Sequence, residues 1–312
     1  ATAISTGRGD AAMAVILGAQ SSALNSMLHY QTQEERSADE SAVKLLSQTE
    51  QSTDGLKKFM LKIRKRNSLS GIEENPYFRT HPLTSERISH FEQASKNNHY
   101  GAVSSLDDTL KFIKAKLAGF LLDKNRILRI YPPADSSMAS RYAHSILYFR
   151  GGQITKALEE IDVLINWQPR NPYFHELKGQ FLFESGQVAQ SIPAYEKALN
   201  LLPNNYLLQI SLAHAILENN PSENDRQKAI NLLQKSIITQ SNAFSWQLLA
   251  RAYDMNNDKA SSYYAAAEYS YAIGNLEATK RQLDEAKNAS SNQSLKLKIA
   301  DLQERIKADM KP

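Results

Sequence analysis

Trp246-Gln247-Leu248-Leu249-Ala250-Arg251-Ala252-Tyr253 is the stretch that decides the fold of most of this 312-residue chain. Trp246, Leu249 and Tyr253 follow one another at helical spacing, so they lie on one side of a helix. Ala250 stands among them as a small residue that lets a second helix approach closely. Large side chains beside a small one predict two helices packed as a pair.

Similar segments recur at a fixed interval upstream of this stretch. Gly152 and Gly186 are 34 residues apart, and so are Pro169 and Pro203. A 34-residue period is the signature of tetratricopeptide repeats, and the stretch above resembles their W-x-x-L-G-x-x-Y pattern. The period disfavours the alternative, a helical bundle without repeats. Other repeat positions are occupied by Tyr148, Ala157, Gly179, Tyr195, Ala198, Leu212, Ala213, Ala229, Leu233, Ala267, Gly274, Leu283 and Ala286.

The sequence therefore predicts an all-α chain with three parts. Residues 134–312 form the repeat array, with an insertion near Asn220-Pro221-Ser222 and a terminal helix from Asn292 to Lys311 that seals it. Residues 96–133 form a connector helix and linker that end at the break Tyr131-Pro132-Pro133. Residues 1–95 form a separate helical part. The buried face expected of the connector helix contains Leu106, Leu110, Ile113, Leu117 and Leu121.

Composition sets limits on function. Charged residues make up 22% of the chain, close to an ordinary soluble share, and the formal net charge is +4. The only dense basic run is Arg64-Lys65-Arg66, so nothing predicts nucleic-acid binding. The chain has no Cys, which excludes disulfides and thiolate metal ligands. The apolar segment from Ala11 to Ala19 is far too short to cross a bilayer.

Two carboxylates interrupt the amphipathic pattern expected between about Ser22 and Ser47. Glu35 lies on the predicted buried stripe, and Asp39 follows one turn later on roughly the same side. Because neighbouring carboxylates repel and are costly to bury, a cation should sit beside them. The alternative is two solvated charges paired with Arg36 or Lys44. The predicted stripe consists of Leu24, Leu28, Gln31, Glu35, Ala38, Ala42 and Leu45.

The segment Glu35-Arg36-Ser37-Ala38-Asp39 resembles the ExxAD element of gluzincin metallopeptidases related to HtpX, the prenyl-protein proteases and the periplasmic β-barrel assembly-enhancing protease. In that family the Glu is a zinc ligand and the Asp orients a zinc-binding His. The resemblance implies these roles for Glu35 and Asp39, with zinc as the cofactor.

The family's other zinc element, HExxH, is absent from the sequence. The nearest string begins at His175 but has Gly179 where the second His belongs. We expect residue 1 to lie downstream of the HExxH helix of a longer protein, and this chain alone to be inactive, because one carboxylate cannot make a catalytic zinc site. The alternative is a degenerate relative that never had HExxH.

The segment from Asn75 to Arg87 resembles the family's Asn-Pro, His-Pro and Arg sequence. The resemblance implies that His81 can reach the zinc as an extra ligand and block the site, and that Arg87 holds substrate or transition-state charge. The residues alone suggest otherwise for His81, because Pro82 fits the first turn of a helix and leaves His81 as its cap.

The resemblance implies a zinc metalloendopeptidase with a tetratricopeptide array that binds protein substrates, located in the periplasm and acting in outer-membrane protein quality control, with outer-membrane assembly machinery as a further partner. The alternative is a non-catalytic adaptor that binds peptides through the array. His144, His175 and His214 lie on the first helices of three repeats, and we interpret them as unrelated imidazoles rather than a metal site.

Overall fold

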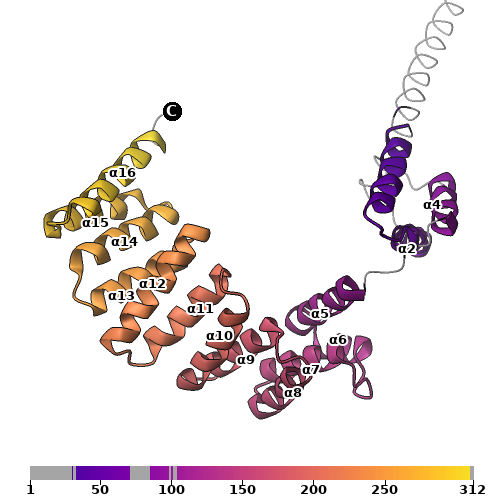
Figure 1. Ribbon diagram of the computed structural model, residues 1–312, viewed down its shortest axis with the longest axis horizontal. Coiled ribbons are helices and arrows are strands. Elements are labelled where there is room, and N and C mark those ends of the chain that lie inside the picture. Colours follow the sequence, from indigo (N-terminus) through magenta and orange to yellow (C-terminus); the bar gives the residue numbers. More distant parts are fainter. Residues whose placement is uncertain (1–29, 31–32, 71–84, 98–99, 101–103, 310–312) are drawn as a thin grey trace, which may run out of the picture. The chain divides into compact units, whose positions relative to one another are not determined.

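A computed structural model describes residue 30 and residues 33–70, 85–97, 100 and 104–309 (Figure 1). Within those ranges every regular element is a helix, which confirms the all-α prediction. The chain divides into two compact units, residues 1–109 and residues 110–312.

The first unit is built from three described helices around a small apolar core. A helix at residues 33–48 is followed by α2 (Asp54–Ser70) and α4 (Ser85–Asn97). Phe91 of α4 is fully buried, and Ile88 and Met60 are nearly so. The partly buried residues Val43, Leu56 and Leu61 pack against these three.

The helix at residues 33–48 turns a different face inward from the one predicted. Leu45 is 61% exposed and Ala38 is also exposed, whereas Asp39 is buried and Val43 joins the core. The physical reason is that a cation from α4 neutralises the carboxylates, so the polar side of this helix can face its neighbours. The prediction from hydrophobic periodicity alone counted residues such as Leu45 as buried and therefore chose the wrong face of the helix.

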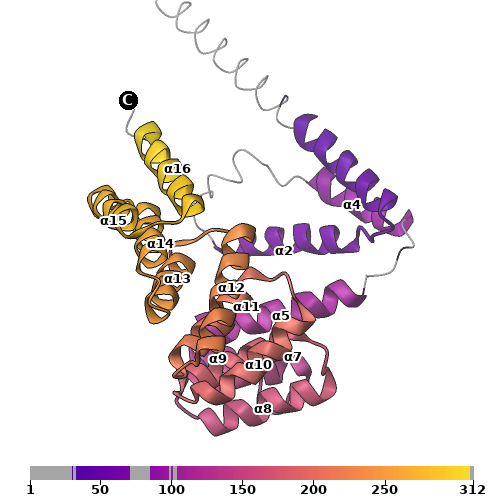
Figure 2. The same cartoon turned by 60° about the vertical axis from the view of Figure 1, so that its left-hand side comes forward.

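The second unit is a series of antiparallel helices that lie side by side in chain order (Figures 1 and 2). Four of them, α7, α9, α11 and α13, have 13 residues each and begin 34, 34 and 37 residues apart, at positions 138, 172, 206 and 243. The interval of 37 contains the insertion predicted near Asn220. The helices are α5 (Ser104–Leu121), α6 (Lys124–Ile130), α7 (Met138–Arg150), α8 (Ile154–Trp167), α9 (Pro172–Glu184), α10 (Val188–Leu201), α11 (Tyr206–Glu218), α12 (Glu223–Thr239), α13 (Ala243–Met255), α14 (Lys259–Ala272), α15 (Leu276–Ala289) and α16 (Gln293–Asp309).

Local sequence signals explain why the repeat helices begin and end where they do. Asn171, Asn205 and Asn242 are the N-caps of α9, α11 and α13, and each side chain accepts a hydrogen bond from a backbone N–H of the first turn. Such a cap stabilises a helix by about 1 kcal/mol. Gly152 and Gly186 turn the chain after α7 and α9 with φ of 73° and 81°, a region that favours glycine.

Small residues set the distance between paired helices. A Cβ added at Gly179 of α9 would lie 2.8 Å from the ring of Tyr195 in α10. Gly179 is the eighth residue of its helix, and Ala213 and Ala250 occupy the eighth position of α11 and α13. The prediction that small residues allow close helix pairs is confirmed at this position.

The segment that the sequence assigned to a connector packs onto the array. Ala115 of α5 and Ile127 of α6 are fully buried in one cluster with Tyr142 and Ile146 of α7. The aliphatic row expected to be buried points outward instead, because Phe112, Ala115 and Ala118 on the opposite side of α5 make the packing contacts. Its exposed fractions are 46% for Leu110, 51% for Ile113, 53% for Leu117 and 73% for Leu121.

The terminal helix α16 packs against the last helices of the array. Leu295, Ile299, Leu302 and Ile306 of α16 are buried against residues of α14 and α15. Among the described residues, no helix has the length and apolar character needed to cross a membrane.

Candidate functional site

The two carboxylates that disturbed the sequence pattern lie together in the first unit. Glu35 and Asp39 are one turn apart on the helix at residues 33–48. The Glu35 side chain is 14% exposed and that of Asp39 is 8% exposed. Burial of two like charges so close together requires a compensating cation.

Arg87 of α4 is that cation. Its Nε lies 2.6 Å from Oδ2 of Asp39 and its Nη2 lies 2.8 Å from Oδ1, so the guanidinium grips this carboxylate with two parallel hydrogen bonds. Its Nη1 lies 2.8 Å from Oε2 of Glu35. One planar guanidinium thus joins both carboxylates, a geometry that the single ammonium of a lysine cannot reproduce.

The apolar core fixes the direction of Arg87. Phe91 lies one turn after Arg87 on α4 and is fully buried, and Ile88 is 3% exposed. These two side chains orient α4 so that Arg87 points toward the helix at residues 33–48. The core and the ion pairs therefore support the same arrangement of helices.

The neighbouring charges lie outside this cluster. Arg36 pairs with Glu40 at 3.3 Å on the exposed side of the helix, and Lys44 is exposed. The expectation of a cation beside Glu35 and Asp39 holds, but the cation comes from a residue 48 positions away from Asp39 rather than from Arg36 or Lys44.

Three of the four predicted site residues are thus brought together, and the fourth, His81, lies outside the described residues. In the part of the chain that the structure describes, no three His, Cys, Asp or Glu side chains are grouped so that they could hold a metal ion. A catalytic zinc ion requires three protein ligands, usually with imidazoles among them. The described carboxylates alone do not fit such a site.

A second candidate site lies on the repeat helices. It is an aromatic track of three neighbouring rings, Phe183 of α9, His214 of α11 and Phe244 of α13. The ring of His214 lies 4.7 Å from that of Phe183 and 5.3 Å from that of Phe244. Next to it, Glu218 forms an ion pair with Arg251. Burial lowers the pKa of His214, although Glu218 opposes this effect.

The sequence analysis did not predict a row of exposed apolar residues that includes Phe244 of this track. Tyr173, Leu207 and Phe244 are the second residues of α9, α11 and α13, and they are 54%, 56% and 45% exposed. Equal position in successive repeat helices places them in one row. The detectable signal was a large apolar residue two places after each Asn cap.

The three histidines of the repeats form no common site. His144 and His175 are buried, and their Nε2 atoms bond the carbonyl oxygens of Tyr131 and Pro169 at 2.9 Å. His214 lies between two aromatic rings. Each of the three imidazoles thus has its own separate partners.

Comparison with known proteins gives a different result for each of the two units. The model of peptidase family M48 matches residues 1–95. No curated protein matches the chain.

Solved structures resemble the repeat part only distantly. MamA 41-end from Desulfovibrio magneticus RS-1 is 17% identical with a TM-score of 0.41, and the match covers 55% of this chain and 97% of that one. TTC0263, a thermophilic TPR protein in Thermus thermophilus, is 15% identical with a TM-score of 0.39, and the match covers 58% of this chain and 94% of that one. The repeat assignment stands on the 34-residue offsets of the helices.

Proposed function

We propose that this chain, whose residues 1–95 match peptidase family M48, works as part of a zinc-dependent endopeptidase that recruits protein substrates through its tetratricopeptide array. The observation that carries the proposal is the buried cluster of Glu35, Asp39 and Arg87 within the matched segment. Carboxylates are costly to bury, and a metal site would be a reason for them at these positions besides the ion pairs that join the two helices.

In this proposal the ExxAD element contributes one metal ligand, Glu35, and the remaining ligands come from an HExxH element, which these 312 residues do not contain. A carboxylate has two oxygens with about four acceptor positions, so the contact of Glu35 with Arg87 is compatible with a bond to a metal. Zinc, when bound, supplies a polarised water for attack on a peptide carbonyl. Arg87 and Asp39 act as positioning residues, because they hold the helix that bears Glu35.

The test uses the intact protein with any residues upstream of Ala1. We expect Glu35→Gln to lose both zinc, measured by elemental analysis, and casein cleavage. Asp39→Asn should weaken zinc binding by about 10–100-fold, as loss of a residue that orients ligands does. Glu34→Gln is the matched control, because Glu34 is an exposed neighbour on the same helix. Unchanged zinc and turnover in Glu35→Gln would make Glu35 a structural residue only.

His81 is proposed as a displaceable fourth ligand that competes with water. Replacement by Ala should then raise turnover at equal zinc content and equal fold stability. Equal turnover would favour a helix-capping role, and loss of zinc with activity would make His81 an obligatory ligand.

A periplasmic location, with a role in outer-membrane protein quality control and contact with outer-membrane assembly machinery, is proposed from the resemblance of the ExxAD and His-Pro-Arg segments. Cell fractionation of the intact protein tests the location. Recovery of the protein in the cytoplasm would refute it.

An adaptor without catalysis is the second candidate function, and the row of Tyr173, Leu207 and Phe244 favours it. Exposed apolar residues in one row suit an extended or helical peptide. If the intact protein binds unfolded polypeptides but never cleaves them, and a Phe244→Ser variant loses that binding, the adaptor role is the better account.

A further inference from the structure

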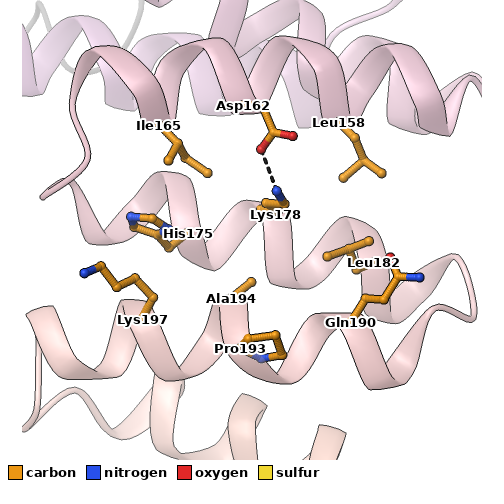
Figure 3. Close-up of a pocket in the computed structure, with 10 residues that line it drawn as sticks. All are labelled: Leu158, Asp162, Ile165, His175, Lys178, Leu182, Gln190, Pro193, Ala194 and Lys197. Atoms are coloured by element: carbon orange, nitrogen blue, oxygen red, sulfur yellow. Dashed lines mark hydrogen bonds and ion pairs between the residues drawn. The ribbon is translucent and has the colours of Figure 1, made fainter.

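A hollow of about 530 Å³ lies between three helices of the array, α8, α9 and α10 (Figure 3). Each of the three helices contributes residues one turn apart on a single face, and each face forms one wall of the hollow. Its apolar surface comes from Leu158, Ile165, Leu182, Pro193 and Ala194. Its polar groups come from Asp162, His175, Lys178, Gln190 and Lys197.

The hollow exists because the second repeat lacks the large side chains that fill this space in another repeat. His175, Lys178 and Leu182 are the fourth, seventh and eleventh residues of α9. The same positions of α13 hold Trp246, Leu249 and Tyr253, which pack against the core of the array. The volume missing from the second repeat is therefore of aromatic size.

The charges in the hollow do not balance. Lys178 Nζ lies 2.6 Å from Oδ1 of Asp162, so this cation is already paired. Lys197 makes no ion pair or hydrogen bond with any residue in the described part of the chain, and it is exposed at the edge (Figure 3). Two lysines against one carboxylate leave one positive charge beside an apolar surface.

His175 forms part of the wall of the hollow. Its Nε2 lies 2.9 Å from the carbonyl oxygen of Pro169, and because a carbonyl only accepts, that nitrogen carries the hydrogen. The bond ties the ring to the loop before α9. The ring is therefore a fixed part of the wall.

We propose that this hollow binds a carboxylate carried on an aromatic or bulky aliphatic group. The apolar group takes the space that tryptophan and tyrosine fill in the fourth repeat, and the carboxylate pairs with Lys197. A volume of this size is within the range of small-ligand sites. The ligand is either a free organic acid or the C-terminal residue of a polypeptide, which share this chemistry. The inference does not rest on the peptidase function, because every residue involved belongs to the repeats.

The first experiment measures binding by isothermal titration calorimetry to the full 312-residue chain. The probes are N-acetyl-tryptophan, its amide, and a tetrapeptide Ala-Ala-Gly-Trp with a free or an amidated C-terminus. We expect the acids to bind about tenfold or more tightly than the amides, since a hydrogen bond to a charged group has that effect. A tetrapeptide that binds more tightly than the free acid points to polypeptide ends, and equal binding points to a small acid.

The second experiment separates the two features of the site with variants. Lys197→Met should reduce acid binding about tenfold and leave amide binding unchanged. Lys235→Met is the matched control, because Lys235 is an exposed lysine on α12 outside the hollow. The double variant His175→Trp, Lys178→Leu introduces two of the three fourth-repeat residues and should abolish binding without loss of helicity, measured by circular dichroism.

Four results would overturn the proposal. The first three are equal binding of acids and amides, unchanged acid binding in Lys197→Met, and no saturable binding of any probe. Binding that persists in a folded double variant would place the ligand elsewhere and would equally refute it. If the double variant fails to fold, the comparison of Lys197→Met with Lys235→Met still decides.

Discussion

The guanidinium of Arg87 grips the carboxylate of Asp39 through two hydrogen bonds, Nε to Oδ2 at 2.6 Å and Nη2 to Oδ1 at 2.8 Å. This pair, with the further contact to Glu35, links α4 to the helix at residues 33–48. Among the described residues of the first unit, few apolar side chains form the core, so the ion pairs have a large share in holding these helices together.

Arg87→Met should therefore unfold or loosen the first unit. Removal of one partner from a buried ion pair costs about 3–5 kcal/mol, because the remaining charge is buried without compensation. Hydrogen-exchange mass spectrometry should show lost protection in residues 33–48 and in α4, while peptides of α7 to α13 keep theirs. The array serves as an internal control in the same chain.

Arg36→Met provides the matched variant for that experiment. Arg36 and Glu40 are both largely exposed, and such a pair contributes about 0.3–0.5 kcal/mol. Equal loss of protection in the Arg36 and Arg87 variants would contradict the structural role given to Arg87.

A second prediction concerns the close approach of α9 and α10. Gly179→Ala should lower the free energy of unfolding of the array by about 1–3 kcal/mol, because the new methyl group would meet the Tyr195 ring at 2.8 Å. Chemical denaturation measures the change. Gly55→Ala, in the first turn of α2, is the contrasting substitution, since a Cβ added there would meet no atom within 4 Å apart from its chain neighbours and its own helix backbone. It should therefore not destabilise the first unit, to which α2 belongs. Destabilisation by both substitutions would argue against a packing cause.

The features of the fold that could be predicted are those that short stretches of the sequence specify. The array was predictable because equivalent turn and small residues recur at a fixed interval of 34 positions, as Gly152, Gly186 and Gly179 illustrate. The burial of Glu35 and Asp39 was predictable as a need for a cation. Its source, Arg87, was not predictable from local pattern, because no periodicity links residues 48 positions apart.

The exposed aliphatic row on α5 shows a different limit of prediction from sequence. Leu110 and Leu117 have the spacing of a buried face, but Phe112 and Ala115 on the other side also have apolar character. When a helix is apolar on two sides, spacing cannot decide which side packs. Lys178 carried a signal that was overlooked, because a lysine at a core position of a repeat indicates a missing side chain and a hollow.

A third prediction concerns the terminal helix. Glu268 of α14 is 5% exposed and is held by Tyr264, whose hydroxyl donates to it at 2.6 Å, and by Arg305 of α16. Arg305→Met should destabilise the end of the array by about 1–3 kcal/mol, because a buried carboxylate loses its cation. Limited proteolysis should then cut within α16 sooner than in the wild type. Lys307→Met is the control, since Lys307 pairs only with exposed Glu304.

The last prediction is a pH dependence that originates at His214. Burial between Phe183 and Phe244 lowers the pKa of this imidazole below its ordinary value of 6.5, and the positive charge of Arg251 also lowers it, whereas Glu218 raises it. A histidine with a lowered pKa binds its proton more readily in the unfolded chain than in the fold. The unfolding free energy should therefore fall as the pH drops below about 6.5 and should level off once the folded form is also protonated.

His214→Gln should flatten this decline, because glutamine does not titrate. Denaturant unfolding of both proteins between about pH 7.5 and pH 5, in steps of about half a unit, measures the difference. Glu218 affects only the lower end of that pH range. Its hydrogen bond with Arg251 lowers its pKa, so its contribution to the unfolding free energy is lost only as the pH falls below the pKa of an unfolded glutamate. Parallel curves for wild type and His214→Gln would show that His214 stays accessible to protons in the fold, and the aromatic enclosure would then have no effect on its protonation.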